Sequence, residues 1–206
     1  MNDTLFLSGH SIELRIPTEE DMYNTNWHSW YNNMETTKYN SHGVYPVSVD
    51  QEYKIVKSIM DKEDTILCSI YDKNSSKLVG NAALQNIDLI NRNCNLATTV
   101  GEKAPFTTTI EVWGLLIEHA FMRLNLHRVY DGTHQELKKL VDILSVLGVK
   151  EEGVSKDHFL RDDQYFDKIN FAILKKDFLL LKQERKGYIL FEDYKDLQKE
   201  IIKAAT

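Results

Sequence analysis

The sequence has little cysteine, proline or glycine, with two, three and nine residues of these types in a chain of 206. So little proline and glycine excludes collagen-like and linker-dominated chains. The two cysteines, Cys68 and Cys94, lie in apolar or strand-like stretches without the CxxC spacing of a metal or redox site. We therefore expect reduced thiols in a cytoplasmic protein, with no disulfide framework and no metal centre.

Long apolar runs and an excess of basic residues are also missing. A membrane-spanning helix needs about 20 apolar residues, whereas the longest runs here, among them 178–181 and 188–191, have four. The N-terminus lacks a basic segment followed by an apolar one, as a secretory signal would have. With 31 acidic against 25 basic residues the net charge is −6, which argues against non-specific nucleic-acid binding. We expect no membrane and no nucleic-acid partner.

What is present is the composition of an ordinary folded protein. Hydrophobic residues make up 42% of the chain and charged residues 27%, close to globular averages. A length of 206 residues fits one domain, or one domain with an appendage, and is enough to bury a substantial core.

The hydrophobic pattern predicts a mixed α/β chain. Alternating apolar and polar residues predict strands at 11–16, 65–71, 77–87, 94–100, 127–131, 149–159 and 165–174. Helical spacing predicts helices at 27–34, 49–60, 110–124 and 137–147, the last stopped by Gly148. Residues 17–21 predict a turn before the segment 27–34, with acidic residues suited to a first helical turn. Short turns between the strands imply mostly antiparallel pairing.

The last part of the chain carries a further apolar stripe at helical spacing. Its residues are Leu190, Tyr194, Leu197, Ile201 and Ala204. A helix with such a face must pack against something. That partner is its own domain, which we favour slightly, or a second subunit, so that the protein is a monomer or a homodimer.

Several segments, in order and at suitable spacing, resemble the GNAT superfamily of acyl-CoA-dependent N-acyltransferases. The most specific are Leu-Asn-Leu-His-Arg-Val at 124–129 and Leu-Gly-Val-Lys-Glu-Glu-Gly at 147–153. The closest branch looks like the one of ribosomal-protein alanine acetyltransferases and bacterial amino-sugar acetyltransferases. The other matching runs are 12–15, 30–39, 40–43, 79–88, 119–123 and 165–174.

The resemblance implies a fold and an activity. The fold would be a mostly antiparallel sheet, flanked by helices on both faces and split between its fourth and fifth strands. It would occupy residues 1–177, with a helical extension at 178–206. The activity would be transfer of an acetyl group from acetyl-CoA to a primary amine of a small molecule. Residues 38–43 look most like members that act on amino sugars or nucleotide sugars.

The resemblance also implies where acetyl-CoA would bind, and there the sequence departs from the family pattern. Main-chain groups of Thr98, Thr99 and Val100 would bind the pantetheine arm, and a loop at 104–109 would bind the phosphates. That loop holds no glycine, and Pro105 has no N–H group. The cofactor residues implied in and after it are Thr107, Thr108, Thr109 and Ile110. The alternative is that the threonines simply begin a helix, since Thr108 and Glu111 have capping-box spacing.

The catalytic candidates are His42 and Asp88. A histidine with a pKa near ~6.5 suits a general base, although an ordinary loop histidine is the more frequent case. Asp88 lies where a strand meets a turn, so turn formation is the favoured alternative. Asn95 stands where many related members carry a glutamate, and an amide takes up no proton at neutral pH.

The resemblance implies that residues of the segments 30–39 and 40–43, which precede the predicted helix at 49–60, would bind the acceptor. The candidates are Trp30, Tyr39, Asn40 and His42. Trp27 could line the same pocket, although aromatic residues at helical spacing more often belong to a core. Because the cofactor loop is degenerate, a competing hypothesis is a GNAT-fold binding or interaction protein that has lost acyl transfer.

Overall fold

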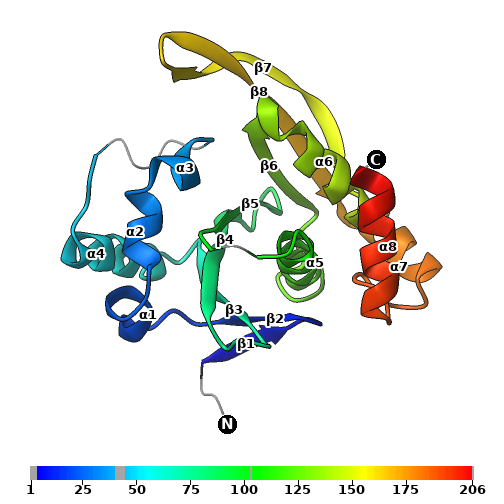
Figure 1. Ribbon diagram of the computed structural model, residues 1–206. Helices are drawn as coiled ribbons and strands as arrows, with labels where there is room; N and C mark the ends of the chain where they lie inside the picture. The colour runs from blue at the N-terminus through cyan, green and yellow to red at the C-terminus, as the bar shows by residue number, and fades with distance from the viewer. Residues whose placement is uncertain (1–3, 40–44, 103, 206) are drawn as a thin grey trace. The chain divides into compact units, whose positions relative to one another are not determined.

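The computed structural model describes residues 4–39, 45–102 and 104–205 (Figure 1). These residues form two compact units. The first unit contains the chain up to Ile87 together with Ala97–Val112, and the second contains Asp88–Leu96 together with the chain from Trp113 onward. Two strands and one helix therefore begin in one unit and end in the other.

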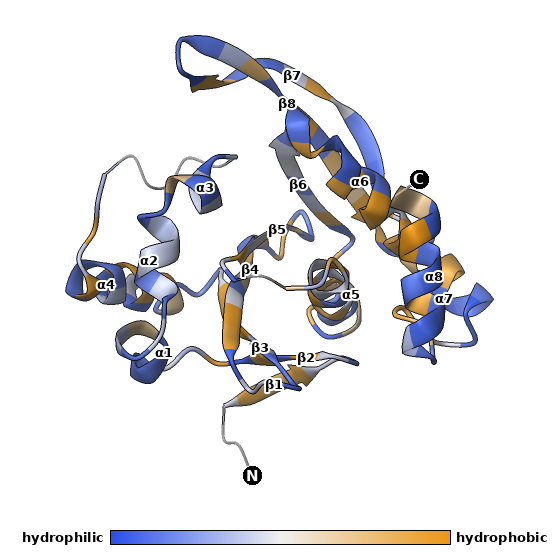
Figure 2. Ribbon diagram, in the orientation of Figure 1, coloured by the Kyte–Doolittle hydropathy of each residue, from blue (hydrophilic) through white to orange (hydrophobic). Residues whose placement is uncertain are grey.

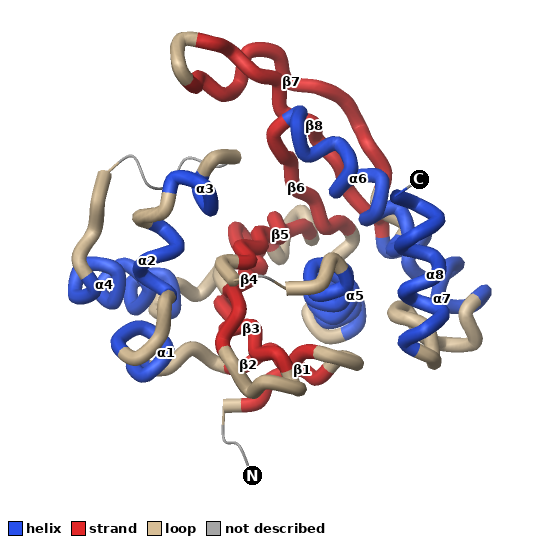
Figure 3. Tube along the Cα trace, viewed as in Figure 1, coloured by secondary structure: helices blue, strands red, loops and turns tan. Residues whose placement is uncertain are grey.

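Helices and strands alternate in groups along the chain (Figure 3). The first half contains β1 (Leu5–Ser8), β2 (Ile12–Arg15), α1 (Glu19–Tyr23), α2 (Trp27–Tyr31), α3 (Met34–Thr37), α4 (Val49–Met60), β3 (Ile66–Asp72), β4 (Leu78–Asp88) and β5 (Asn93–Val100). The second half contains α5 (Thr107–Met122), β6 (Arg128–His134), η1 (Gln135–Leu137), α6 (Lys138–Leu144), η2 (Ser145–Leu147), β7 (Lys150–Arg161), β8 (Gln164–Leu174), α7 (Lys175–Glu184) and α8 (Tyr194–Ala205).

The strands hydrogen-bond in the order β1-β2-β3-β4-β5-β6-β8-β7. The pairs β1–β2, β2–β3, β3–β4, β6–β8 and β7–β8 are antiparallel, and β5–β6 is parallel. The predicted class, a mixed α/β chain with a mostly antiparallel sheet and flanking helices, is confirmed. The predicted fourth and fifth strands are β5 and β6. Their parallel ladder joins Asn93–Asn95 to Arg128–Tyr130, and both strands run on beyond it.

Some boundaries differ from the sequence prediction for local reasons. The segment 27–34 is broken into α2 and α3, because Asn33 leaves the helix and its side chain accepts the Glu35 N–H at 2.9 Å, which caps α3. The segment 137–147 is divided into η1, α6 and η2, and Gly148 ends it in the left-handed conformation (φ 83°), as predicted.

The core of the first unit is aromatic. Trp27 and Trp30 of α2 are almost fully buried and stack at a ring-centroid distance of 6.2 Å. Met22, Val56 and Leu78 complete this cluster, so that α1, α2 and α4 pack together through it. The four N-terminal helices stand beside one another in the blue and cyan part of Figure 1.

Two glycines allow close approach in this unit. A Cβ at Gly101 would lie 2.0 Å from the Trp30 ring, so the indole packs directly on the backbone that follows β5. A Cβ at Gly80 would lie 2.3 Å from the Thr99 carbonyl oxygen, so β4 needs a glycine where it passes β5.

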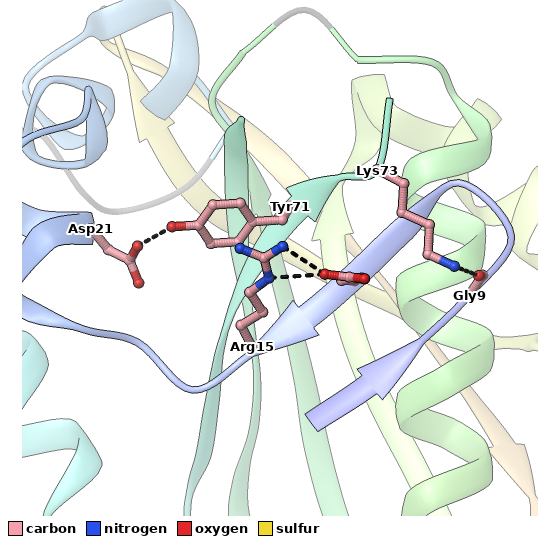
Figure 4. Close-up of polar contacts among 6 residues, drawn as sticks. Gly9, Arg15, Asp21, Tyr71 and Lys73 are labelled. Atoms are coloured by element: carbon pink, nitrogen blue, oxygen red, sulfur yellow. Dashed lines mark hydrogen bonds and ion pairs between the residues drawn. The ribbon is translucent and has the colours of Figure 1, made fainter. Parts of the chain in front are cut away.

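A buried carboxylate joins α1 to the sheet (Figure 4). Asp21 accepts hydrogen bonds from the Ser69 hydroxyl at 2.7 Å, from the Tyr71 hydroxyl, and from the Thr18 N–H at 2.9 Å. The Arg15 guanidinium lies 4.0 Å from the centre of the Tyr71 ring. Three donors compensate for the burial of Asp21, so its role is structural.

A second buried carboxylate, Glu111 on α5, is held by the turn before β2. It accepts hydrogen bonds from the Ser11 N–H at 2.9 Å and the Ser11 hydroxyl at 2.5 Å. The predicted capping box of Thr108 and Glu111 is therefore wrong. The helix begins earlier, at Thr107, and the glutamate serves a tertiary contact instead.

The second unit is built on the later turns of α5. Trp113 contacts Phe171 of β8 at a ring-centroid distance of 5.7 Å, and Phe121 contacts Phe178 of α7 at 5.2 Å. A Cβ at Gly114 would lie 2.4 Å from the Leu190 side chain, so the segment between α7 and α8 packs closely there.

The predicted C-terminal helix is α8, which carries both hydrophilic and hydrophobic residues (Figure 2). Its Leu197 and Ile201 are buried, and it packs against α6 and η2 of its own unit. The proposed boundary after residue 177 falls inside α7. Among the described residues no helix is long and apolar enough to cross a membrane.

A polar pair joins β5 to β6 within the second unit. The Asn95 amide donates to the Asp131 carboxylate at 2.9 Å and to the Tyr130 carbonyl oxygen at 3.2 Å. Burial raises the pKa of Asp131 to about 6, although the Gly132 N–H, the Asn95 amide and the Lys168 charge oppose this rise. A carboxyl group thus lies next to the asparagine that replaces the family's glutamate.

We predict that Gly101→Ala destabilises the protein by roughly 1–3 kcal/mol, because the methyl group overlaps the Trp30 ring. Urea denaturation of the two proteins measures the difference. A double-mutant cycle with Trp30→Leu provides the control, because the methyl group should cost much less when the indole is absent. An unchanged urea midpoint for Gly101→Ala would contradict the prediction.

We also predict that Asp131→Asn flattens the dependence of stability on pH. The folded-state pKa of about 6 lies above the ordinary value of 3.8, so ionisation disfavours the folded state. Because of this group, stability should fall by roughly 2 kcal/mol as pH rises from 4 to 7, out of about 3 kcal/mol for the whole rise through both pKa values, at roughly 1.4 kcal/mol per pKa unit. The difference in unfolding free energy between variant and wild type, measured over that range, should grow in favour of the variant.

Candidate functional site

The first unit contains a cavity of about 430 Å³. Its wall combines aromatic and aliphatic side chains with a few polar ones, which is typical of a small-molecule site. The lining residues come from α2, the segment before α4, α4 itself, and strands β3, β4 and β5. They are Trp27, Tyr31, Tyr45, Val47, Glu52, Ile55, Val56, Ile59, Leu67, Asn81, Ala83, Gln85, Ala97, Thr98 and Thr99.

Helix α4 presents one face to this cavity. Ser48 and Gln51 form a reciprocal capping box that begins the helix at Val49. From that start, Glu52 and three aliphatic residues fall at helical spacing on the same side, at 52, 55, 56 and 59. The capping box therefore fixes which side chains of α4 reach the cavity.

Glu52 is the one charged residue among the described residues that line the cavity. Its side chain is buried, with 6% of the residue exposed. The Trp27 indole N–H donates to its Oε1 at 3.1 Å, and this is the one hydrogen bond that the Glu52 carboxylate makes in the described part of the chain. Burial raises the pKa of Glu52, and the Trp27 hydrogen bond partly opposes the rise.

The wall formed by β4 and β5 carries polar groups. The Tyr31 hydroxyl donates to Asn81 Oδ1 at 3.0 Å, and burial raises the pKa of Tyr31. Asn81 Nδ2 and Thr98 Oγ1 are both buried without a hydrogen-bond partner among the described residues. Buried polar groups are usually satisfied, so these two atoms mark places where a bound molecule would supply the partner.

Two of the three residues predicted on the cofactor strand, Thr98 and Thr99, line the cavity. Val100 follows them at the end of β5. The close approach of Gly80 to the Thr99 carbonyl oxygen fixes this strand against β4.

The predicted phosphate loop leads directly into α5. Thr107, Thr108 and Ile110 are buried, and Thr109 is partly exposed. The Thr108 N–H donates to the Pro105 carbonyl oxygen at 2.9 Å. The helix begins at Thr107, so the threonines form its first turn. This agrees with the alternative that these threonines simply begin a helix.

Of the predicted catalytic residues, His42 lies outside the described residues, as does Asn40. Asp88, at the end of β4 in the second unit, accepts hydrogen bonds from the Ile90 N–H, the Asn91 N–H and the Asn91 amide at 2.8, 2.8 and 2.6 Å. These bonds lower the pKa of Asp88 and close the turn before β5. Asp88 thus stabilises this turn, and its catalytic role stays a prediction.

The predicted acceptor residues Trp30 and Tyr39 are not among the described residues that line the cavity. Trp30 belongs to the core cluster, and its indole donates to Glu102 at 3.1 Å. Tyr39 is partly buried, and the Lys38 ammonium lies 4.9 Å from the centre of its ring.

Sequence reasoning missed Glu52, Asn81 and Tyr31. Glu52 left one signal, an acidic residue within the apolar stripe of α4. Asn81 lies within an otherwise hydrophobic stretch of β4, whose neighbours Ala82, Ala83 and Leu84 are buried. A polar residue in such a stretch needs a partner. Within the described part of the chain, no group of His, Cys, Asp and Glu could hold a metal ion.

No protein-family model matches this sequence, and no curated protein matches it. Solved structures do match its fold. A GCN5-related N-acetyltransferase from Brucella melitensis superposes with a TM-score of 0.72 at 16% identity, covering 98% of this chain and 95% of its own. A GNAT-family acetyltransferase from Bacillus anthracis gives 0.70 at 16% identity, over 84% and 99% of the two chains.

The spermidine N-acetyltransferase from Vibrio cholerae, crystallised in complex with CoA and spermine, gives a TM-score of 0.69. It is 22% identical and covers 82% of this chain and 98% of its own. At such identities the likeness establishes the fold and leaves the acceptor open. The chain has the fold of the GCN5-related N-acetyltransferases.

Proposed function

We propose that this chain transfers an acetyl group from acetyl-CoA to a primary amine of a small molecule. The observation that carries the proposal is the cavity of the first unit, which sets a buried carboxylate and unsatisfied polar groups beside the threonines of β5. A fold shared with N-acetyltransferases supports the reaction class. The sequence itself resembles the branch that acts on ribosomal-protein alanines and amino sugars.

The reaction needs little covalent chemistry from the protein. The amine nitrogen attacks the thioester carbonyl carbon, the new C–N bond replaces the C–S bond, the nitrogen loses a proton, and the thiolate of CoA takes one up. Holding the two reactants together supplies much of the rate. A general base and hydrogen-bond donors for the oxyanion supply the rest.

Two parts of the first unit would hold acetyl-CoA. Thr98, Thr99 and Val100 would offer main-chain groups along β5 to the pantetheine arm. Residues Thr107 to Ile110 form the first turn of α5, a helix of 16 residues. The positive end of its dipole favours phosphate, although Pro105 contributes no N–H group.

The acceptor class has two candidates. Residues 38–43 resemble those of relatives that acetylate amino sugars or nucleotide sugars. The Vibrio cholerae enzyme was crystallised with spermine, which adds polyamines to the classes to be compared.

One observation favours a second function, a binding protein that no longer transfers acetyl groups. Thr107 is buried and Thr109 partly exposed in the first turn of α5, at the two positions where the family pattern has a small residue, usually glycine, that lets a phosphate approach the backbone. Such a protein would keep the cavity for an amine and lose the acyl donor.

We predict that acetyl-CoA binds the full chain, because the helix terminus and β5 offer complementary groups. Isothermal titration calorimetry measures binding. A thiol-release assay over amino sugars, polyamines and peptide N-termini then identifies the acceptor. No binding at millimolar acetyl-CoA would overturn the proposed activity, and binding without thiol release from any class would favour the binding protein.

We further predict that His42→Ala lowers kcat by roughly 100-fold or more while leaving the affinity for acetyl-CoA nearly unchanged, as loss of a general base would. His10→Ala, which changes an exposed histidine of the β1–β2 turn, is the control. Asp88→Asn tests the second catalytic candidate in the same assay. An unchanged kcat removes the residue in question from the mechanism.

A further inference from the structure

The buried carboxylate of Glu52 lacks the compensation that the other buried acids of its unit receive. Asp21 accepts three hydrogen bonds and Glu111 accepts two. Glu52 accepts one, from Trp27, and forms no ion pair within the described residues. An ionised carboxylate in such surroundings is costly unless a cation pairs with it.

The surroundings of Glu52 specify what kind of cation fits. Three aliphatic residues of the same face of α4, Ile55, Val56 and Ile59, line the cavity, and Leu67 and Ala83 add to the apolar wall. Methylene groups pack well against such a wall. The hydroxyl groups of a sugar ring would lose hydrogen bonds to water there without replacement.

We propose that Glu52 binds an ammonium group of the acceptor other than the one that is acetylated, so that the acceptor is an aliphatic amine with at least two cationic nitrogens. This rests on the proposed function and narrows it to one acceptor class. Among the acceptors named above it favours a diamine or polyamine over an amino sugar.

The chemistry of the reaction explains why the bound ammonium is not the reacting one. An amine attacks a thioester only as the neutral base. A carboxylate beside an ammonium favours the charged form and holds the proton in place. Glu52 would therefore hinder a nitrogen that must lose its proton, whereas it would anchor a second nitrogen that stays charged.

The polar groups near β5 suit the other end of such a molecule. Asn81 Nδ2 is a donor without a partner and Thr98 Oγ1 a hydroxyl without one, and both are buried. They are neutral, so they can orient a neutral amine or the thioester oxygen without fixing a proton on the nitrogen. The cavity thus offers a charged anchor and a separate neutral polar wall.

If Glu52 binds an ammonium group, the affinity for the acceptor should depend on whether Glu52 is protonated. Burial raises the pKa of this carboxyl above its ordinary value. The acceptor's cation pairs with the ionised form, so the affinity for a diamine should rise as pH rises through that pKa and level off above it. Tyr31 and Tyr45 are the other titratable residues among the described lining, and burial raises the pKa of Tyr31 further above that range. The remaining polar groups of the lining are an indole, amides and hydroxyls of Trp27, Asn81, Gln85, Thr98 and Thr99, which stay uncharged.

The test compares 1,5-diaminopentane with pentylamine and glucosamine, each of which carries one nitrogen. At about pH 8 an aliphatic ammonium is still charged. For the wild type we expect kcat/KM for the diamine to exceed that of either monoamine by about 10- to 100-fold, the range of a hydrogen bond to a charged group. Glu52→Gln should abolish this preference, and Glu52→Asp should keep part of it.

Glu102→Gln is the matched control. Glu102 also accepts an indole N–H at 3.1 Å, from Trp30, but it is exposed and does not line the cavity. This variant should keep the wild-type preference. Thermal denaturation of the variants separates loss of recognition from loss of folding.

The outcomes separate this inference from the proposed activity. Equal kcat/KM for diamine and monoamines in an active wild type overturns the inference, as does a Glu52→Gln variant that is folded and keeps the preference. If the wild type shows no acetyl transfer, the binding of 1,5-diaminopentane to the wild type and to Glu52→Gln, measured by calorimetry without acetyl-CoA, tests the inference instead. Binding that is lost in Glu52→Gln supports the anchor, and no difference between the two proteins rejects it.

Discussion

The candidate site depends on how two tryptophans of one short helix are packed. Trp27 and Trp30 stack within the core of the first unit, and each uses its indole N–H to hold a glutamate, Glu52 and Glu102 respectively. Trp30 can lie where it does because Gly101 has no side chain. A large aromatic ring buries much apolar area and still needs a partner for its N–H group. The same contacts that build this core therefore orient the carboxylate in the cavity.

The three buried acids among the described residues of this unit differ in how well their carboxylates are paired. Asp21 and Glu111 receive two or more donors from other elements, so each joins a helix to the sheet at little net cost. Glu52 is equally buried and receives one. Since an incompletely paired charge destabilises a folded protein, the presence of Glu52 in a cavity with unpartnered polar atoms supports the proposal that it pairs with a bound cation.

The residues that depart from the family pattern make identifiable contacts in the structure. The threonines of the glycine-free segment form the first turn of α5, and Thr107 and Thr108 are buried. Glu111 in the next turn is held by Ser11. These threonines therefore stabilise the helix whether or not a phosphate binds. The asparagine that replaces a glutamate on β5 donates to Asp131 on the neighbouring strand. A group that titrates near neutral pH is thus present beside that position, on a different element.

The amino-acid sequence by itself determined the element types, the mixed α/β class and the amphipathic α8, because strand alternation, helical periodicity and capping residues are local signals. It placed α4 within the bounds that the structure shows, since Ser48 and Gln51 cap its first turn. It did not reveal the short edge strand β1 or the break between α2 and α3.

Only the tertiary structure decided which polar residues meet. Trp27 and Glu52 are 25 positions apart, and Tyr31 and Asn81 are 50 apart; nothing in either segment alone predicts their contact. Trp27 and Trp30 both belong to the core cluster, but of these two only Trp27, together with Tyr31 of the same helix, is among the described residues that line the cavity. A helix of five residues offers little periodicity to tell its faces apart. Burial and pairing depend on neighbours distant in sequence, so the function of a carboxylate is decided by what packs around it.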